Sequence, residues 1–192
     1  MEEIIAGHIQ DERVQSLTDY LDGTMRLAEG FGACMGQGAE AGLLGKIHDE
    51  GKDTAAFQDY IHGRKHRRVD HSTAGAKSFF ENADIGWLRL LGAFCVAGHH
   101  AGIPDFGSKV DTAGTSTLQG RMKKDIPSVR HPELYSMDST SINKHHLNEL
   151  IASRNALDVM MLTRMLFSCL VDADFLLSLI HISEPTRLLS IS

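Results

Sequence analysis

The sequence has few cysteines and none of the spacings that mark a thiol-based site. Its three cysteines, Cys34, Cys95 and Cys169, are far apart, form no CxxC pair and lie in apolar surroundings. We interpret them as buried, reduced thiols of a cytosolic protein. The first residues, 1–4, also lack the basic segment and the long apolar core of a signal peptide. We therefore expect a cytoplasmic location.

Long apolar runs and an excess of basic residues are absent as well. No run reaches the length that crosses a membrane, so we expect no membrane partner. The formal net charge of −6 argues against a wholesale basic nucleic-acid binder. It does not exclude a nuclease, because a metal ion in the site supplies its own positive charge.

The chain also lacks convincing strand alternation and internal repeats. Its 192 residues, 42% of them hydrophobic, suffice for one domain with a substantial core. Apolar residues recur at helical spacing, which predicts an all-α domain. Residues 1–13 are expected to be a polar lead, 30–38 a glycine-rich connection and 104–141 a long irregular insertion. The predicted helices cover 14–31, 39–47, 54–62, 72–80, 85–97 and 142 into the 170s.

The end of the chain reads differently from the rest. Residues 178–192 resemble translated vector or adapter sequence, so we expect them to be a non-native tail without a functional role. The functional domain is expected to cover residues 1–177. We expect the natural protein to continue further, so that the sequence is a fragment.

The most informative stretch is His48-Asp49, at the end of an apolar helical run. Imidazole and carboxylate groups are ligands for hard or borderline divalent ions. Adjacent helical residues point about 100° apart, so the two could share one ion only over the helix end. Gly51 is a plausible residue to end that helix. Further ligands must then come from other segments. The alternative without a metal is that His48 and Asp49 are an ordinary helix-capping or surface pair.

Three further polar groups also lie at the ends of apolar helices. They are His71, the pair His99-His100, and the acidic pair Asp172 and Asp174. Asp174 lies on the edge of an apolar stripe, where a carboxylate needs a cation or a hydrogen-bond donor, so we favour it over Asp172.

The remaining polar residues have simpler interpretations. His71 could also just begin a helix beside Asp70. Lys52 is either an ordinary exposed lysine or a group that neutralises charge near a bound phosphate. We interpret the other histidines as surface residues: His8, His62, His66, His131 and the pair His145-His146.

Several segments together resemble a known family. They are Gly45-Lys46-Ile47-His48-Asp49-Glu50-Gly51-Lys52, Ala56-Phe57-Gln58, Asp70-His71-Ser72-Thr73-Ala74-Gly75-Ala76, Gly98-His99-His100-Ala101-Gly102-Ile103-Pro104-Asp105 and Leu170-Val171-Asp172-Ala173-Asp174. In this order they resemble the HD nuclease domain of the CRISPR-associated nuclease-helicase of type I interference. The match covers nearly all of residues 4–176.

The resemblance implies a helical HD-domain bundle with one or two divalent ions (Mn, Co, Ni or Fe, with Mg possible). It implies cleavage of single-stranded DNA, the displaced strand of an R-loop, in antiviral defense. The implied partners are the RNA-guided surveillance complex and a helicase domain or subunit. That helicase is usually downstream in the same chain and is absent from this sequence.

The resemblance also assigns roles by position. His48, Asp49 and Asp174 match the core HD ligands, whereas His71, His99 and His100 match the second metal position. Lys52 matches the lysine that follows the HD pair. The family has a further histidine in its first helix, where this chain has Tyr20, and a phenol is a poor ligand near neutral pH.

These residues support a metal-dependent phosphodiesterase as the leading hypothesis. Bound ions would activate a water molecule and hold phosphate oxygens, with Asp49 and Lys52 as the catalytic residues. The basic loop with Arg64, Lys65, Arg67 and Arg68 is either a contact for the DNA backbone or a solvated loop. Two alternatives stay open: an HD-type phosphohydrolase of small nucleotides, and an inactive metal-binding fragment.

Overall fold

The computed structural model describes residues 4–10, 13–153 and 155–183, and these are mainly helical, as predicted. The α-helices are α1 (Leu17–Ala33), α2 (Gly38–Ile47), α3 (Ala55–Ile61), α4 (Ser72–Glu81), α5 (Leu88–Gly98), α6 (Leu118–Met122), α7 (Lys144–Ala152) and α8 (Ala156–Ser183). Short 3-10 helices are η1 (Glu50–Asp53), η2 (Ala83–Ile85) and η3 (Pro132–Tyr135). In the described part of the chain, no helix is long and apolar enough to cross a membrane.

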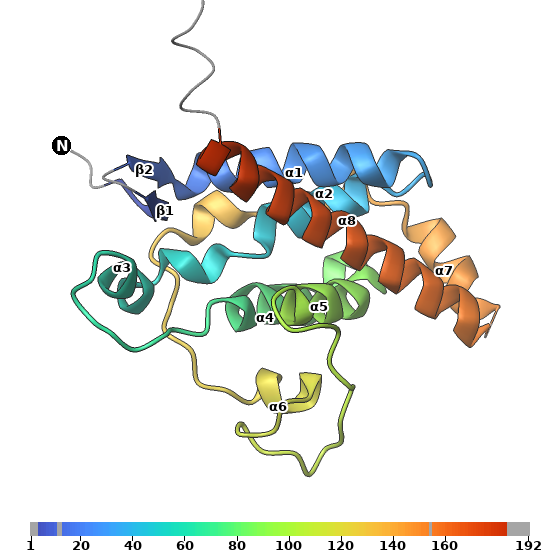
Figure 1. Cartoon of the computed structure of the whole chain (residues 1–192). Coiled ribbons are helices and arrows are strands. Elements are labelled where there is room, and N and C mark those ends of the chain that lie inside the picture. The colour runs from blue at the N-terminus through green and yellow to red at the C-terminus, as the bar shows by residue number, and fades with distance from the viewer. Residues whose placement is uncertain (1–3, 11–12, 154, 184–192) are drawn as a thin grey trace, which may run out of the picture.

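The bundle is built from two helix pairs and a long crossing helix. Helix α1 packs along α2, α4 packs along α5, and α8 crosses over α1, α2 and α5 (Figure 1). Each helix turns an apolar face to the shared core, whose fully buried members include Leu17, Leu21, Leu44, Phe79, Leu88, Leu166 and Leu170. Burying each such side chain contributes on the order of 2 kcal/mol, so this core holds the helix ends in fixed relative positions.

A β-hairpin precedes α1, and this corrects the prediction of a polar lead without strands. Strands β1 (Ala6–Gln10) and β2 (Arg13–Ser16) pair antiparallel. Gln58 of α3 anchors the hairpin: it accepts a hydrogen bond from Ala6 N at 3.0 Å and donates one to Ala6 O at 2.9 Å. Ser16 caps α1, so the helix begins at Leu17, later than predicted.

The second half of the chain also differs from the prediction. The single helix expected from residue 142 is two helices, α7 and α8, and the insertion 104–141 contains α6 and η3. Helix α8 continues through residues 178–183 of the predicted tail, whereas residues 184–192 lie outside the described part.

One assignment of a single side chain is incomplete and another is wrong. The side chain of His131 is 42% exposed, as expected for a surface residue, but its Nδ1 also lies 3.1 Å from the buried carboxylate of Asp53, 78 residues away, because the insertion folds back on η1. Cys34 is exposed near the end of α1, whereas Cys95 and Cys169 are buried as predicted. The predicted surface pair His145-His146 is exposed.

The buried carboxyl group of Glu50 predicts a pH-dependent stability. Burial raises the pKa of Glu50 to about 7, although a hydrogen bond from Ser78 opposes the shift. The unfolded chain releases this proton near its ordinary pKa of 4.5, so between these pH values the folded state binds more protons and loses stability as the pH rises.

Replacing Glu50 with Gln should therefore stabilise the fold above pH 7 by roughly 2–3 kcal/mol and change little below pH 4.5. Urea unfolding at several pH values measures this, with the exposed Glu133→Gln as the matched control. A pH-independent effect of Glu50→Gln would contradict this prediction.

Candidate metal centre

The histidines at two helix ends are each oriented by a hydrogen bond to a backbone carbonyl of their own helix. His48 directly follows α2 and His99 directly follows α5, and each points its Nδ1 at the carbonyl oxygen three residues earlier. These contacts are His48 Nδ1 to Gly45 O at 2.9 Å and His99 Nδ1 to Val96 O at 2.8 Å. A carbonyl oxygen can only accept, so Nδ1 carries the hydrogen and the lone pair of the neutral ring lies on Nε2.

His71 reaches the same place from the start of α4. Its Nδ1 lies 3.2 Å from Val69 O, which also leaves the lone pair on Nε2. Three imidazoles from three helix ends are thus oriented by backbone carbonyls, with their Nε2 atoms available as ligands. This is the usual way in which a protein fixes the tautomer of a metal-binding histidine.

Asp49 lies at the centre of these rings. Its side chain is buried, and its two oxygens face different groups. Oδ1 lies 3.4 Å from His71 Nε2 and 3.3 Å from His99 Nε2. Oδ2 lies 3.3 Å from His48 Nε2 and 2.9 Å from Lys52 Nζ. One buried carboxylate is therefore shared by three imidazoles and an ammonium group.

Several of these atoms lack a hydrogen bond. Both Asp49 oxygens and His99 Nε2 are buried without a hydrogen-bond partner among the described residues; Lys52 Nζ is close to Oδ2 but is not aligned for a hydrogen bond. Buried polar atoms left unpaired are costly and call for an unseen partner. A cation between a carboxylate oxygen and neutral imidazole nitrogens satisfies both kinds of atom at once.

Two overlapping groups have the spacing of a metal site. One consists of Asp49, His71, His99 and His100, and the other of His48, His99 and Asp174; in each, the ligand atoms lie within 4.8 Å of one another. All six residues are among those that the sequence predicted as ligands. The structure therefore brings together side chains that are up to 126 residues apart.

His100 lies at the exposed mouth of the cluster, and its Nε2 is 2.8 Å from His71 Nε2. Since Nδ1 of His71 donates to a carbonyl, its Nε2 accepts and His100 donates. Two nitrogens bound to one tetrahedral ion at about 2.0–2.1 Å would be roughly 3.3 Å apart. Binding an ion thus requires a small outward movement of His100 and transfer of its proton from Nε2.

Lys52 is buried, and its ammonium group is held by the N-terminal hairpin as well as by Asp49. Its Nζ lies 3.3 Å from Gly7 O and 3.4 Å from His8 Nε2, and 4.6 Å from the centre of the Tyr20 ring. His8 was expected at the surface, but its ring packs edge-on against Tyr20. The interpretation of Lys52 as an ordinary exposed lysine is therefore excluded.

Tyr20 stands beside the second carboxylate of the cluster. Its hydroxyl donates a hydrogen bond to Asp174 Oδ1 and lies 3.5 Å from His48 Nε2. Burial, followed by the charges of Asp49 and Asp174, raises the pKa of Tyr20 well above its ordinary value, so the phenol keeps its proton. Asp172, the alternative acidic residue, is exposed and belongs to neither group.

The charges favour an ionised carboxylate and, at the mouth, neutral histidines. Burial alone would raise the pKa of Asp49, but Lys52 and then His48 hold it well below its usual range. Burial and the neighbouring His99 lower the pKa of His100 to about 4, and burial lowers that of His71. The pKa of His48 is raised, because Asp49 and Asp174 outweigh the effect of burial. His71 and His100 are thus ready as ligands at neutral pH.

Glycines let the ligand-bearing segments approach closely. A Cβ on Gly51 would lie 2.2 Å from His71 O, and one on Gly75 would lie 2.5 Å from Ile47 O. The predicted role of Gly51 as the residue that ends the helix is wrong, because α2 ends at Ile47 and Gly51 lies inside η1. Gly51 is instead required by the contact between η1 and the His71 backbone.

Replacing Gly51 with Ala should therefore push His71 away from Asp49 and destabilise the fold by about 1–3 kcal/mol. Gly30 in α1 has open space around its Cβ position, so Gly30→Ala should be neutral or stabilising by up to about 1 kcal/mol. Thermal melting of both variants, with and without Mn²⁺, gives the comparison. Equal melting temperatures and equal metal-induced shifts would refute the close-packing argument.

The predicted nucleic-acid loop is exposed, but its charges are not equivalent. Arg64 Nε lies 3.3 Å and Lys65 Nζ 2.8 Å from the carboxylate of Asp59, whereas Arg67 and Arg68 are exposed without an ion pair among the described residues. The loop directly precedes His71. Arg67 and Arg68 are thus the members with charge available to an anionic chain.

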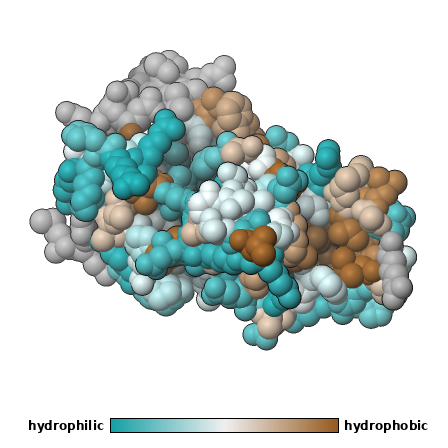
Figure 2. Space-filling view, turned by 90° about the horizontal axis from the view of Figure 1, so that it is seen from below, coloured by the Kyte–Doolittle hydropathy of each residue, from teal (hydrophilic) through white to brown (hydrophobic). Residues whose placement is uncertain are grey.

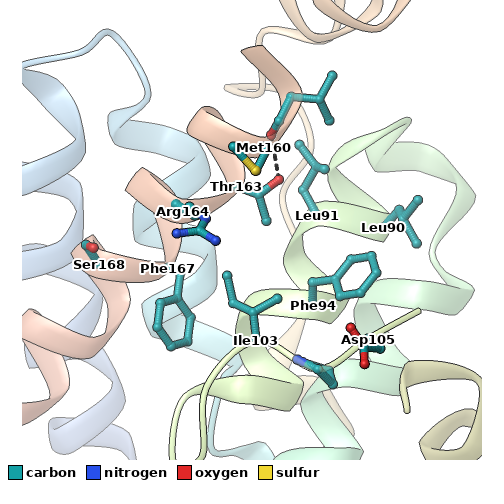
Figure 3. Close-up of a pocket in the computed structure, with 12 residues that line it drawn as sticks. Leu90, Leu91, Phe94, Ile103, Asp105, Met160, Thr163, Arg164, Phe167 and Ser168 are labelled. Atoms are coloured by element: carbon teal, nitrogen blue, oxygen red, sulfur yellow. Dashed lines mark hydrogen bonds between the residues drawn. The ribbon is translucent and has the colours of Figure 1, made fainter. Parts of the chain in front are cut away.

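A pocket of about 670 Å³ lies apart from the cluster, between α5 and α8 (Figure 3). Phe94, Ile103 and Phe167 line its apolar part, and Arg164 and Asp105 are its charged members. It shares no residue with either metal group.

Figure 2 shows an apolar area at the end of the molecule that carries α7 and the start of α8, where the exposed apolar residues are Leu157, Met160, Met161 and Met165.

Comparison with known proteins adds no assignment: the chain matches no protein-family model and no curated protein. What the cluster does is therefore inferred from its chemistry and from the sequence motifs.

Proposed function

We propose that the chain is a metal-dependent phosphodiesterase that cleaves single-stranded DNA, of the HD nuclease type that its motifs resemble. The observation that carries this proposal is the buried Asp49 carboxylate, surrounded by three imidazoles whose Nε2 atoms lie within 3.4 Å of its oxygens. Mixed histidine and aspartate ligands suit Mn, Fe, Co or Ni, while Mg can still support turnover.

The residues divide the chemistry among them. A bound divalent ion would supply a water molecule of lowered pKa and a charge for the phosphate oxygens. Asp49 and the imidazoles hold the ion, and the exposed His100 places one side of the cluster against solvent, where a phosphodiester can approach. Lys52 keeps Asp49 ionised and oriented rather than standing free at the surface.

The surroundings of the cluster favour a polymer over a small nucleotide. The pocket between α5 and α8 shares no residue with the two ligand groups, so a base bound in it would not lie among the ligands. The exposed Arg67 and Arg68 lie in the segment that leads to His71 and suit a phosphate backbone. By the same resemblance, the strand would be the displaced strand of an R-loop, delivered by a helicase and an RNA-guided surveillance complex.

Asp49→Ala should reduce metal-dependent cleavage of a labelled single strand by at least about 100-fold, because it removes a charged ligand. Asp172→Ala, two residues from Asp174 and exposed, is the matched control and should cleave like the wild type. Assays with Mn²⁺, Co²⁺, Ni²⁺ and Mg²⁺ should use DNA and nucleoside triphosphates side by side. Full activity of Asp49→Ala, or hydrolysis of nucleotides alone, would refute the nuclease.

The basic loop gives a separate test. Replacing Arg67 and Arg68 with Ala should weaken single-strand binding and lower the salt dependence of log K by about 0.7 for each lost phosphate contact. Replacing Arg64 and Lys65 should have a smaller effect, since Asp59 already neutralises part of their charge. Fluorescence anisotropy over a salt series measures the slope of log K against log salt for the wild type and both variants. Equal slopes for the three proteins would show that the strand does not contact this loop.

A further inference from the structure

We infer that Lys52 and Tyr20 take the place of a second metal ion, so that the chain binds one ion, in the group Asp49, His71, His99 and His100. This inference rests on the proposed function and narrows it from one or two ions to one. It assigns Lys52 and Tyr20 as positioning residues that fill the three-ligand group of His48, His99 and Asp174.

The shared ligand His99 is the first reason. Its Nδ1 faces Val96 O at 2.8 Å, so Nε2 has the single lone pair of the ring. That nitrogen belongs to both groups, yet it can bind only one ion. When the four-ligand group takes it, the other position keeps only His48 and Asp174 from its own set.

The two oxygens of Asp49 point to the same division. Oδ1 faces His71 and His99 at 3.4 and 3.3 Å and has no lysine or arginine ion pair in the described part of the chain. Oδ2 faces His48 but already has the Lys52 ammonium at 2.9 Å. A divalent ion beside Oδ2 would have to approach that fixed positive charge, whereas an ion beside Oδ1 would not.

Tyr20 fills the remaining space of the three-ligand position. His48 Nε2 and Asp174 Oδ1 are 3.9 Å apart, so an ion bound to both at about 2.0–2.2 Å would lie almost on the line between them. The Tyr20 hydroxyl donates a hydrogen bond to that same Oδ1 and lies 3.5 Å from that same Nε2. It therefore satisfies Asp174 in place of an ion and crowds the place that an ion would occupy.

The four-ligand group shows the opposite condition. Asp49 Oδ1 and His99 Nε2 are buried and have no hydrogen-bond partner within the described residues. Among the residues that the structure describes, the hydrogen-bond partner of His71 Nε2 is His100, at the mouth. Asp49 Oδ2 also lacks a hydrogen bond within the described residues, but it has the Lys52 ammonium at 2.9 Å, and Asp174 Oδ1 has the Tyr20 hydroxyl, so the carboxylate oxygen without a lysine or hydroxyl partner is Oδ1.

Metal content and Mn²⁺ titration calorimetry of the purified chain test this inference. The wild type should bind about one Mn²⁺ per chain. His71→Ala and His100→Ala should each weaken its binding by roughly tenfold or more, because each removes a direct ligand. Tyr20→Phe keeps the ring and removes only the hydroxyl; it should reveal a second, weaker Mn²⁺. Lys52→Met should do the same, and Asp172→Ala should leave one ion bound at unchanged affinity.

Two ions in the wild type would overturn the inference, and so would a stoichiometry of one in Tyr20→Phe that is folded by circular dichroism. Electron paramagnetic resonance adds a second readout, since two neighbouring Mn²⁺ ions give a coupled spectrum and one ion does not. The failures are distinguishable: DNA cleavage with two ions bound defeats only this inference, whereas one ion without cleavage defeats only the proposed nuclease. A chain that binds no Mn²⁺ defeats both.

Discussion

The arrangement depends on keeping one carboxylate ionised where water does not reach it. Asp49 is buried, and burial by itself favours the protonated acid. Lys52, and to a lesser degree His48, offset that cost on the side of Oδ2. The side of Oδ1 faces imidazoles that have no charge to give when they are neutral. Oδ2 therefore forms an ion pair with Lys52, whereas the negative charge on the side of Oδ1 is not balanced by a lysine. A divalent ion bound to Oδ1 would balance it.

The fold produces this geometry by bringing helix ends together. His48 and His99 each use the carbonyl of the last helical turn, a group that the helix itself leaves without a partner. The same contact therefore satisfies the helix end and orients the ligand. Close packing of α2, α4 and α5 then sets the distances, with Gly51 and Gly75 allowing backbone to meet backbone. The third contributor is the hairpin, which closes over Lys52 through Gly7 O.

The ligands could be predicted from the sequence because a polar residue at the end of an apolar helical run is a local pattern. His48 and His99 have that position, and the helical class follows from the same periodicity. The expectation that Asp174 also lies at a helix end is wrong, because α8 continues to Ser183, and Asp174 could be predicted only from the apolar stripe beside it. The hairpin could not be predicted, because its strands β1 and β2 are short and their anchor, Gln58, lies 52 residues from Ala6 in the sequence. The burial of Lys52, the pairing of His131 with Asp53 and the role of Gly51 likewise depend on contacts between distant segments. The contacts of the Tyr20 hydroxyl with Asp174 and His48 could not be predicted either, because composition and spacing do not give the position of that hydroxyl.

The most direct measurement is anomalous X-ray diffraction from crystals of the chain grown with Mn²⁺. We expect one strong peak within about 2.0–2.4 Å of Asp49 Oδ1 and of Nε2 of His71, His99 and His100, with Lys52 still paired with Asp49 Oδ2. A peak between His48 and Asp174 with the Tyr20 hydroxyl displaced, or a cluster without a peak, would contradict it.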